Sequence, residues 1–124
     1  MIEYSNLTIT QFVLKDGRYR VDGLTDLPNG TKLVVSIKAF SDTSFNLQKT
    51  IEVHNSSFTA FFAISSENSS INKKMLVEVF CNPQKQNSGL INRIDHFGKN
   101  FVGESMIILG KLRILKRAKI FELL

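Results

Sequence analysis

The chain has 124 residues, of which 43% are hydrophobic and 22% are charged, and its formal net charge is +5. These values are ordinary for a globular protein with one hydrophobic core, and they exclude a disordered or low-complexity chain. A single cysteine excludes an intramolecular disulfide, and no apolar stretch approaches the roughly 20 residues of a membrane-spanning helix. We therefore expect one domain over residues 1–124, without a transmembrane segment.

Short apolar runs, many of them alternating with polar residues, predict strands along most of the chain. The predicted strands cover residues 7–14, 18–23, 33–40, 47–53, 58–64, 75–81, 103–109 and 112–123. Turn signals separate them, such as Asp16-Gly17, because this dipeptide readily adopts φ > 0. Regular short strands of this kind favour an antiparallel β-sandwich over alternating βαβ units.

The clearest turn signal lies in residues 23–35. Pro28 presets φ for the second position of a β-turn, Asn29 tolerates the left-handed conformation, and Gly30 supplies φ > 0 without strain. The run that follows, residues 33–40, is β-branched and aromatic and suits a pleated surface. The segment therefore predicts a tight turn between two strands.

The period-two pattern stops between the strands predicted at 75–81 and 103–109. Apolar residues recur there at helical spacing, and Gly98 follows as a helix stop. They are Leu90, Ile91, Ile94 and Phe97. We therefore expect a short amphipathic helix over residues 88–97 that caps one end of the sandwich. The expected fold class is all-β with this one short helix.

Three groups of turn and core residues carry a resemblance to a known family. They are Gly23, Leu27, Pro28, Gly30, Thr31, Leu33 and Val35, then Phe58, Thr59 and Phe62, then Gly98, Asn100 and Gly103. With them, residues 18–110 resemble bacterial immunoglobulin-like β-sandwich modules of secreted or surface-attached proteins, although Ser57 stands where the pattern has glycine. The resemblance implies a single antiparallel immunoglobulin-like β-sandwich with a non-enzymatic adhesive, structural or binding role. It also favours a secreted or cell-surface location over a cytoplasmic one.

Basic residues concentrate towards the C-terminus. Residues 89–124 carry seven basic and three acidic side chains, whereas residues 1–88 carry nine and eight. The candidate partner-binding residues are Lys111, Arg113, Lys116, Arg117 and Lys119. Together with the polar loop at 65–74 they form the predicted interaction surface. The simpler interpretation is that these lysines protect an exposed edge strand.

Two classes of function fit this charge distribution. The favoured one is a non-catalytic interaction or structural module that binds another protein through a sheet face, an edge or the basic C-terminal strand. The alternative is a nucleic-acid-binding module that uses the basic residues 111–119. Exposed Phe40 or Phe61 could stack on bases, but their neighbours in the sequence are not basic.

The candidate reactive side chains are His54, His96 and Cys81. Asp95 precedes His96, but adjacent residues on a helix point about 100° apart and do not face each other. Cys81 shares one strand face with apolar core candidates, which predicts a buried, inert thiol. We therefore expect no catalytic residue, no cofactor and no metal site.

Overall fold

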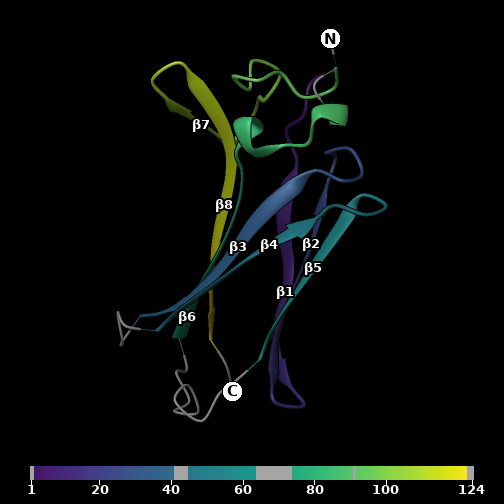
Figure 1. Cartoon of the computed structure of the whole chain (residues 1–124). Coiled ribbons are helices and arrows are strands. Elements are labelled where there is room, and N and C mark those ends of the chain that lie inside the picture. The colour runs from purple at the N-terminus through teal and green to yellow at the C-terminus, as the bar shows by residue number, and fades with distance from the viewer. Residues whose placement is uncertain (1, 41–44, 64–73, 91, 123–124) are drawn as a thin grey trace.

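The computed structural model describes residues 2–40, 45–63, 74–90 and 92–122, and its regular structure is almost entirely β-strand (Figure 1). The strands are β1 (Leu7–Lys15), β2 (Arg18–Thr25), β3 (Lys32–Ala39), β4 (Asn46–Glu52), β5 (Ser57–Ala63), β6 (Lys74–Cys81), β7 (Met106–Leu109) and β8 (Leu112–Glu122). All of them pair antiparallel. The predicted all-β, antiparallel architecture is confirmed, and most strands differ from the prediction only at their ends.

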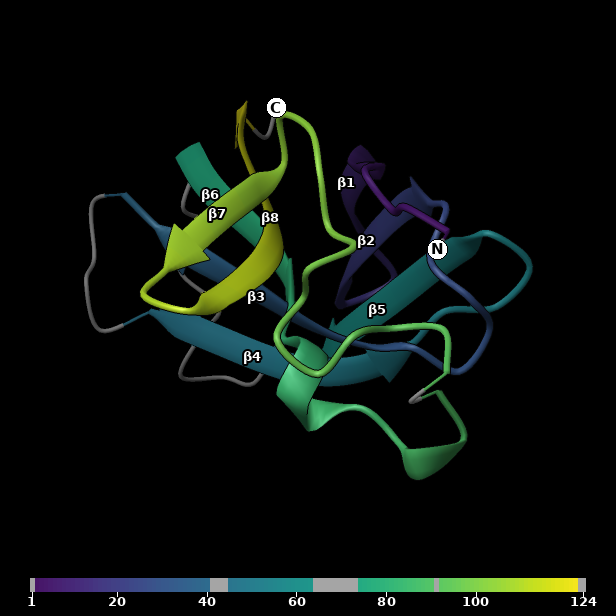
Figure 2. The ribbon, with the colours of Figure 1, turned by 90° about the horizontal axis from the view of Figure 1, so that it is seen from above.

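The strands form two sheets. One has three strands in the order β1-β2-β5, and the other has five in the order β4-β3-β6-β8-β7. Seen from above, the two sheets lie as two layers (Figure 2). The chain crosses between the layers after β2, after β4 and after β5. This topology leaves β4 and β7 as the edges of the five-stranded sheet.

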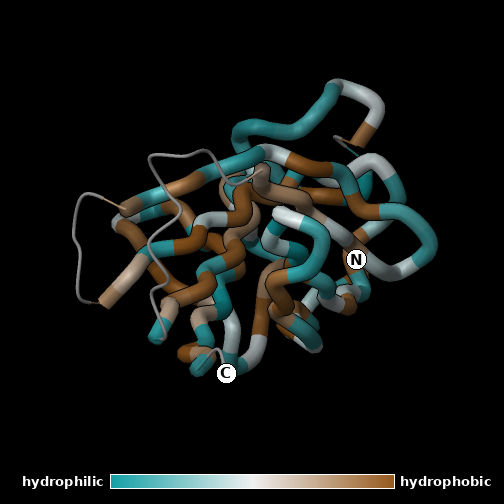
Figure 3. Tube along the Cα trace, turned by 90° about the horizontal axis from the view of Figure 1, so that it is seen from below, coloured by the Kyte–Doolittle hydropathy of each residue, from teal (hydrophilic) through white to brown (hydrophobic). Residues whose placement is uncertain are grey.

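The hydrophobic core lies between the sheets and is filled from both. Val21 and Ala60 of the three-stranded sheet, and Val35, Val77 and Val79 of the five-stranded sheet, are all 0% exposed. Apolar and polar positions alternate along the chain trace (Figure 3), because successive side chains of a strand point to opposite faces. Each fully buried valine of this kind stabilises the fold by about 1.5–3 kcal/mol. The alternation that predicts the strands therefore also builds the core.

The predicted turns are present, but Pro28 occupies the first position of its β-turn and not the predicted second position. Gly30 has φ +85°, and the N–H of Thr31 donates to the carbonyl of Pro28 at 3.2 Å, which closes the turn before β3. Asp16 and Gly17 have φ +54° and +72° in the β1–β2 turn. Two residues with positive φ are typical of a two-residue hairpin turn whose twist matches its strands.

The predicted amphipathic helix over residues 88–97 is wrong. The structure has two single 3₁₀ turns, η2 (Pro83–Lys85) and η3 (Ser88–Leu90), and non-helical turns over residues 92–97. The apolar residues of this segment do not share one helix face. Leu90 and Ile94 are buried, at 8% and 2% exposure, whereas Phe97 is 43% exposed. The segment between β6 and β7 forms an irregular cap over one end of the two sheets (Figure 1).

Asn100 explains why this segment does not become helical. Its buried side chain accepts a hydrogen bond from the N–H of Asp95 at 3.1 Å and donates to the carbonyls of Arg93 at 2.7 Å and Ile2 at 3.1 Å. Side-chain bonds to nearby backbone groups compete with helical hydrogen bonds. The cap is therefore held by Asn100, which also ties it to the N-terminal segment.

Candidate functional site

The basic residues predicted to bind a partner do not form one continuous surface. Arg113, Arg117 and Lys119 lie on the face of β8 that carries buried Leu115, whereas Lys116 lies on the opposite face, because side chains alternate along a strand. Lys111 lies in the β7–β8 turn. Of the loop predicted at 65–74, residues 65–73 lie outside the described residues, and Lys74 begins β6. Partner binding by this run stays a prediction.

Lys116 is engaged in an ion-pair network on the outer face of the five-stranded sheet. The carboxylate of Glu78 lies 3.0 Å from the ammonium of Lys116 and 3.0 Å from that of Lys38. Burial of Glu78 opposes its ionisation, but the two ammonium groups outweigh this effect and hold the pKa of the carboxyl below its ordinary value. The network therefore joins β3, β6 and β8 and gives Lys116 a structural role.

We expect Glu78→Gln to lower the free energy of unfolding by about 1–2 kcal/mol at neutral pH, because it leaves two ammonium groups without their carboxylate. Since the folded pKa of Glu78 lies below the unfolded one, its contribution is present above about pH 5 and is lost as the pH falls through the folded pKa. Urea unfolding near pH 7 and near pH 3 measures this contribution. The difference between wild type and variant should shrink in acid, and a constant difference would contradict the assignment. The exposed Glu52, changed to Gln, is the matched control.

Two of the predicted residues, Lys111 and Arg113, meet at a hollow beside the β7–β8 hairpin. Its volume is about 490 Å³. The lining residues are Phe97, Lys99, Ile108, Gly110, Lys111 and Arg113. Three of these six residues are cationic and none is acidic, so the hollow is suited to a negatively charged ligand group.

The loop that carries Phe97 and Lys99 is held in place by Asp95. The Asp95 carboxylate accepts hydrogen bonds from the N–H of Phe97 at 3.0 Å and of Lys99 at 3.1 Å. The hydrogen bond from the Lys99 N–H lowers the pKa of Asp95. Burial opposes this with a smaller effect, and the bond from the Phe97 N–H lowers the pKa further. The N–H of Arg113 donates to the carbonyl of Phe97 at 2.9 Å, which fastens the loop to β8.

The β7 strand forms an apolar edge next to this hollow. Ile107, Ile108 and Leu109 are 38%, 60% and 54% exposed, and in the described part of the chain no strand pairs with the outer edge of β7. Natural edge strands are usually protected by lysine, proline or a bulge, and β7 has no charged residue and no proline. We call the free edge of β7 together with the hollow the hairpin site.

Sequence reasoning did not predict the hairpin site as a whole. It assigned Phe97 to the apolar face of a helix, and it did not connect Lys99 with the basic residues of β8. One signal was readable in the sequence, because the uncharged run of β7 is followed directly by Gly110 and then by Lys111. The contact between the cap and β8 joins residues more than a dozen positions apart, which no local pattern reports.

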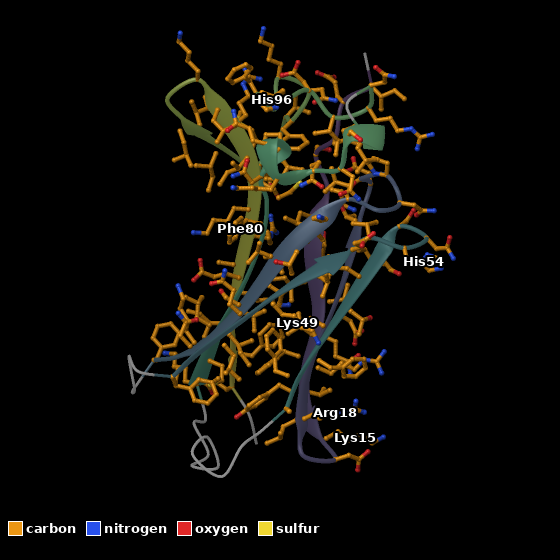
Figure 4. All side chains as sticks on the ribbon, in the orientation of Figure 1. Lys15, Arg18, Lys49, His54, Phe80 and His96 are labelled. Carbon is orange, nitrogen blue, oxygen red and sulfur yellow. The ribbon has the colours of Figure 1, made fainter. Side chains whose placement is uncertain are left out.

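The three candidate reactive side chains lie apart from one another. Cys81 is fully buried in β6, and burial raises the pKa of its thiol to about 12. His54 lies in the exposed β4–β5 turn, and Figure 4 shows His96 at a different turn, in the cap. The ring of His96 packs edge-on against Phe97 at a centroid distance of 5.1 Å. Within residues 2–40, 45–63, 74–90 and 92–122, no three or more His, Cys, Asp or Glu side chains are grouped to hold a metal ion.

Comparisons with protein-family models, with curated proteins and with solved structures found no match to this chain. The described part of the chain contains no helix of the length and apolar character that a bilayer crossing demands. A functional hypothesis for this protein therefore depends on its own surfaces.

Proposed function

We propose that the chain is a non-catalytic protein-binding module that receives an extended acidic segment of a partner along the free edge of β7. In this mode the partner adds a strand to the sheet: main-chain hydrogen bonds supply affinity, and alternate side chains supply specificity. The observation that carries the proposal is an exposed apolar edge strand without protective residues, next to a hollow lined by Lys99, Lys111 and Arg113.

The backbone of β7 is suited to accept such a strand. Residues Gly110 and Lys111 form a two-residue turn, and Leu109 pairs with Leu112 across it. The two residues that flank such a turn are hydrogen-bonded to each other. Along β7, residues whose main-chain groups bond to β8 therefore alternate with residues whose N–H and C=O point away from β8. Ile108 then directs its N–H and C=O to the free edge. A partner strand bonded there brings its side chains over the hollow.

The immunoglobulin-like character of the sandwich belongs to the same proposal. What supports it is the strand order, because the first, second and fifth strands share one sheet and β3, β6 and β8 are neighbours in the other. In the immunoglobulin constant-type arrangement the fourth strand lies beside the fifth, whereas here β4 pairs with β3. Binding through an edge strand is compatible with either arrangement.

The alternative, nucleic-acid binding through residues 111–119, has less support. Because side chains alternate along β8, these basic residues are divided between its two faces. Lys116 is already ion-paired with Glu78 at 3.0 Å. A nucleic acid with regularly spaced phosphates would need the lysine and arginine side chains on one face of the sheet.

The proposal can be tested with a defined peptide of about eight residues in which valine and glutamate alternate. We expect it to bind in fluorescence anisotropy, and we expect the matching valine–lysine peptide not to bind. Ile108→Pro removes the outward N–H and should abolish binding, whereas Ile108→Val should preserve it. Lys111→Glu should weaken the acidic peptide by about fivefold or more.

Urea unfolding of each variant separates a lost site from a lost fold. Equal binding of both peptides, or full binding by a folded Ile108→Pro variant, would refute the strand-addition proposal. Competition by duplex DNA that disappears with salt would instead favour the nucleic-acid alternative.

A further inference from the structure

A second surface, on the three-stranded sheet, combines an exposed aromatic ring with several cations. Phe61 projects from the outer face of β5 and is 37% exposed. The guanidinium carbon of Arg18 lies 4.6 Å from the centre of its ring, and that of Arg20 lies 5.5 Å from it. The ammonium of Lys49 donates to the carbonyl of Phe61 at 3.2 Å. The expectation that Phe61 has no basic neighbours is therefore wrong in the folded chain.

The register of β2 and β5 creates this cluster. Arg20 lies directly opposite Phe61, and Arg18 lies opposite Ala63 on the same face. Residues opposite each other on one face of an antiparallel pair are in side-chain contact. Lys15, the last residue of β1, and Asp16 of the β1–β2 turn lie at the end of the same face. Figure 4 shows Lys15 and Arg18 at the end of the molecule away from the cap and the hairpin site.

A hollow of about 300 Å³ lies at this cluster. Its lining residues are Gln11, Val13, Lys15, Asp16, Arg18, Arg20 and Phe61. Arg20 is also ion-paired with Asp22 at 2.9 Å, which holds its guanidinium beside the ring. Among the described residues, no carboxylate lies within ion-pair distance of Lys15, Arg18 or Lys49. The cluster therefore offers planar groups for stacking and cations for negative charge.

From this geometry we propose that the cluster around Phe61 binds single-stranded nucleic acid. The guanidinium of Arg18 lies over the Phe61 ring, and an unpaired base extends this stack. Lys15 and Lys49 contact the flanking phosphates. Bases stack on aromatic rings and on arginine planes, and phosphates bind lysine and arginine. An apolar protein partner fits poorly, because most of the lining is charged or amide. A duplex fits poorly, because its bases are already stacked.

The probe is an oligothymidylate of about 20 nucleotides with a fluorescent end label, at about 50 mM salt. We expect binding that weakens as salt rises, with tighter binding to the single strand than to a duplex of equal length. Phe61→Leu should weaken binding about tenfold, because a stacking surface is lost while the residue stays apolar. Arg18→Gln should weaken binding and also reduce its dependence on salt.

The matched control is Phe40→Leu, on the other sheet. Phe40 is 49% exposed and its ring centre lies 5.2 Å from the ammonium of Lys74, the one cation over this ring among the described residues. Binding should be unchanged in this variant. Oligouridylate and oligodeoxyuridylate in parallel show whether the sugar matters, and binding of any of these polymers at Phe61 supports the proposal.

Three outcomes would overturn the proposal: no binding at low salt, equal binding of single strand and duplex, or a Phe61→Leu variant that folds and binds like wild type. Because this surface and the hairpin site use different strands, Ile108→Pro should leave oligonucleotide binding intact. Failure here therefore does not affect the proposal for β7.

Discussion

Gly23→Ala should destabilise the protein by about 3 kcal/mol or more, because the position has no room for a side chain. A Cβ at residue 23 would overlap the ring of Phe58 and the carbonyl oxygen of Thr8. Phe58 is only 3% exposed, so its ring cannot move into solvent. Gly23 also lies opposite Ile9, where the register between β1 and β2 shifts. The bulged backbone of β1 therefore approaches β2 closely at Gly23, which has no side chain in the way.

The change in stability is measured by urea unfolding, with the midpoint and the slope compared between variant and wild type. Gly89→Ala is the matched control, because nothing lies within 4 Å of a Cβ built at that position. We expect Gly89→Ala to unfold close to wild type. A Gly23→Ala variant as stable as this control would show that the close approach of β1, β2 and β5 is described incorrectly.

Gly98→Ala should destabilise the cap and weaken the hairpin site at the same time. Gly98 has φ +74°, and a Cβ there would overlap the carbonyl oxygen of Arg113. That oxygen belongs to the β8 backbone, which cannot move away without disturbing the bond between Arg113 N–H and the carbonyl of Phe97. We expect a loss of about 2–4 kcal/mol, of which left-handed strain in a non-glycine residue accounts for about 1–2 kcal/mol.

Gly110→Ala is the control that separates strain from overlap. Gly110 also has a positive φ, +63°, but nothing lies within 4 Å of a Cβ built there. It should therefore show the strain alone. Two variants with equal losses of stability would mean that the loop and β8 are not in close contact. Acidic-peptide binding is the second measurement, and Gly98→Ala should reduce it because Phe97 and Lys99 lose their position beside Arg113.

Local patterns predicted the strands, the places of their main turns and the burial of Cys81. Alternation predicts β2 and β5 correctly because one face of each strand is buried and the other is not. Gly17 and Gly30 were predicted correctly as turn residues because their backbone preference for positive φ is intrinsic. The burial of Cys81 was predicted correctly because an apolar strand face points to the core whichever strand it pairs with.

The helix prediction failed because a local pattern cannot report a distant hydrogen-bond partner. Helical spacing at Leu90 and Ile94 was compatible with a helix, but the side chain of Asn100 bonds to Asp95 N–H and to the carbonyl of Ile2, 98 positions away. For the same reason Lys99 was not predicted as a site residue, because only the fold of the cap brings Lys99 close to Lys111 and Arg113.

The amino-acid sequence by itself determined that this chain builds antiparallel strands with glycine and proline turns, since these depend on each residue's own backbone preference and on period-two hydrophobicity. Only the tertiary structure decided which side chains meet. Strand order placed β7 at an open edge, and register placed Arg20 opposite Phe61, 41 positions away. Both candidate surfaces depend on such pairings, because cross-strand neighbours are chosen by register and packing and not by proximity along the chain.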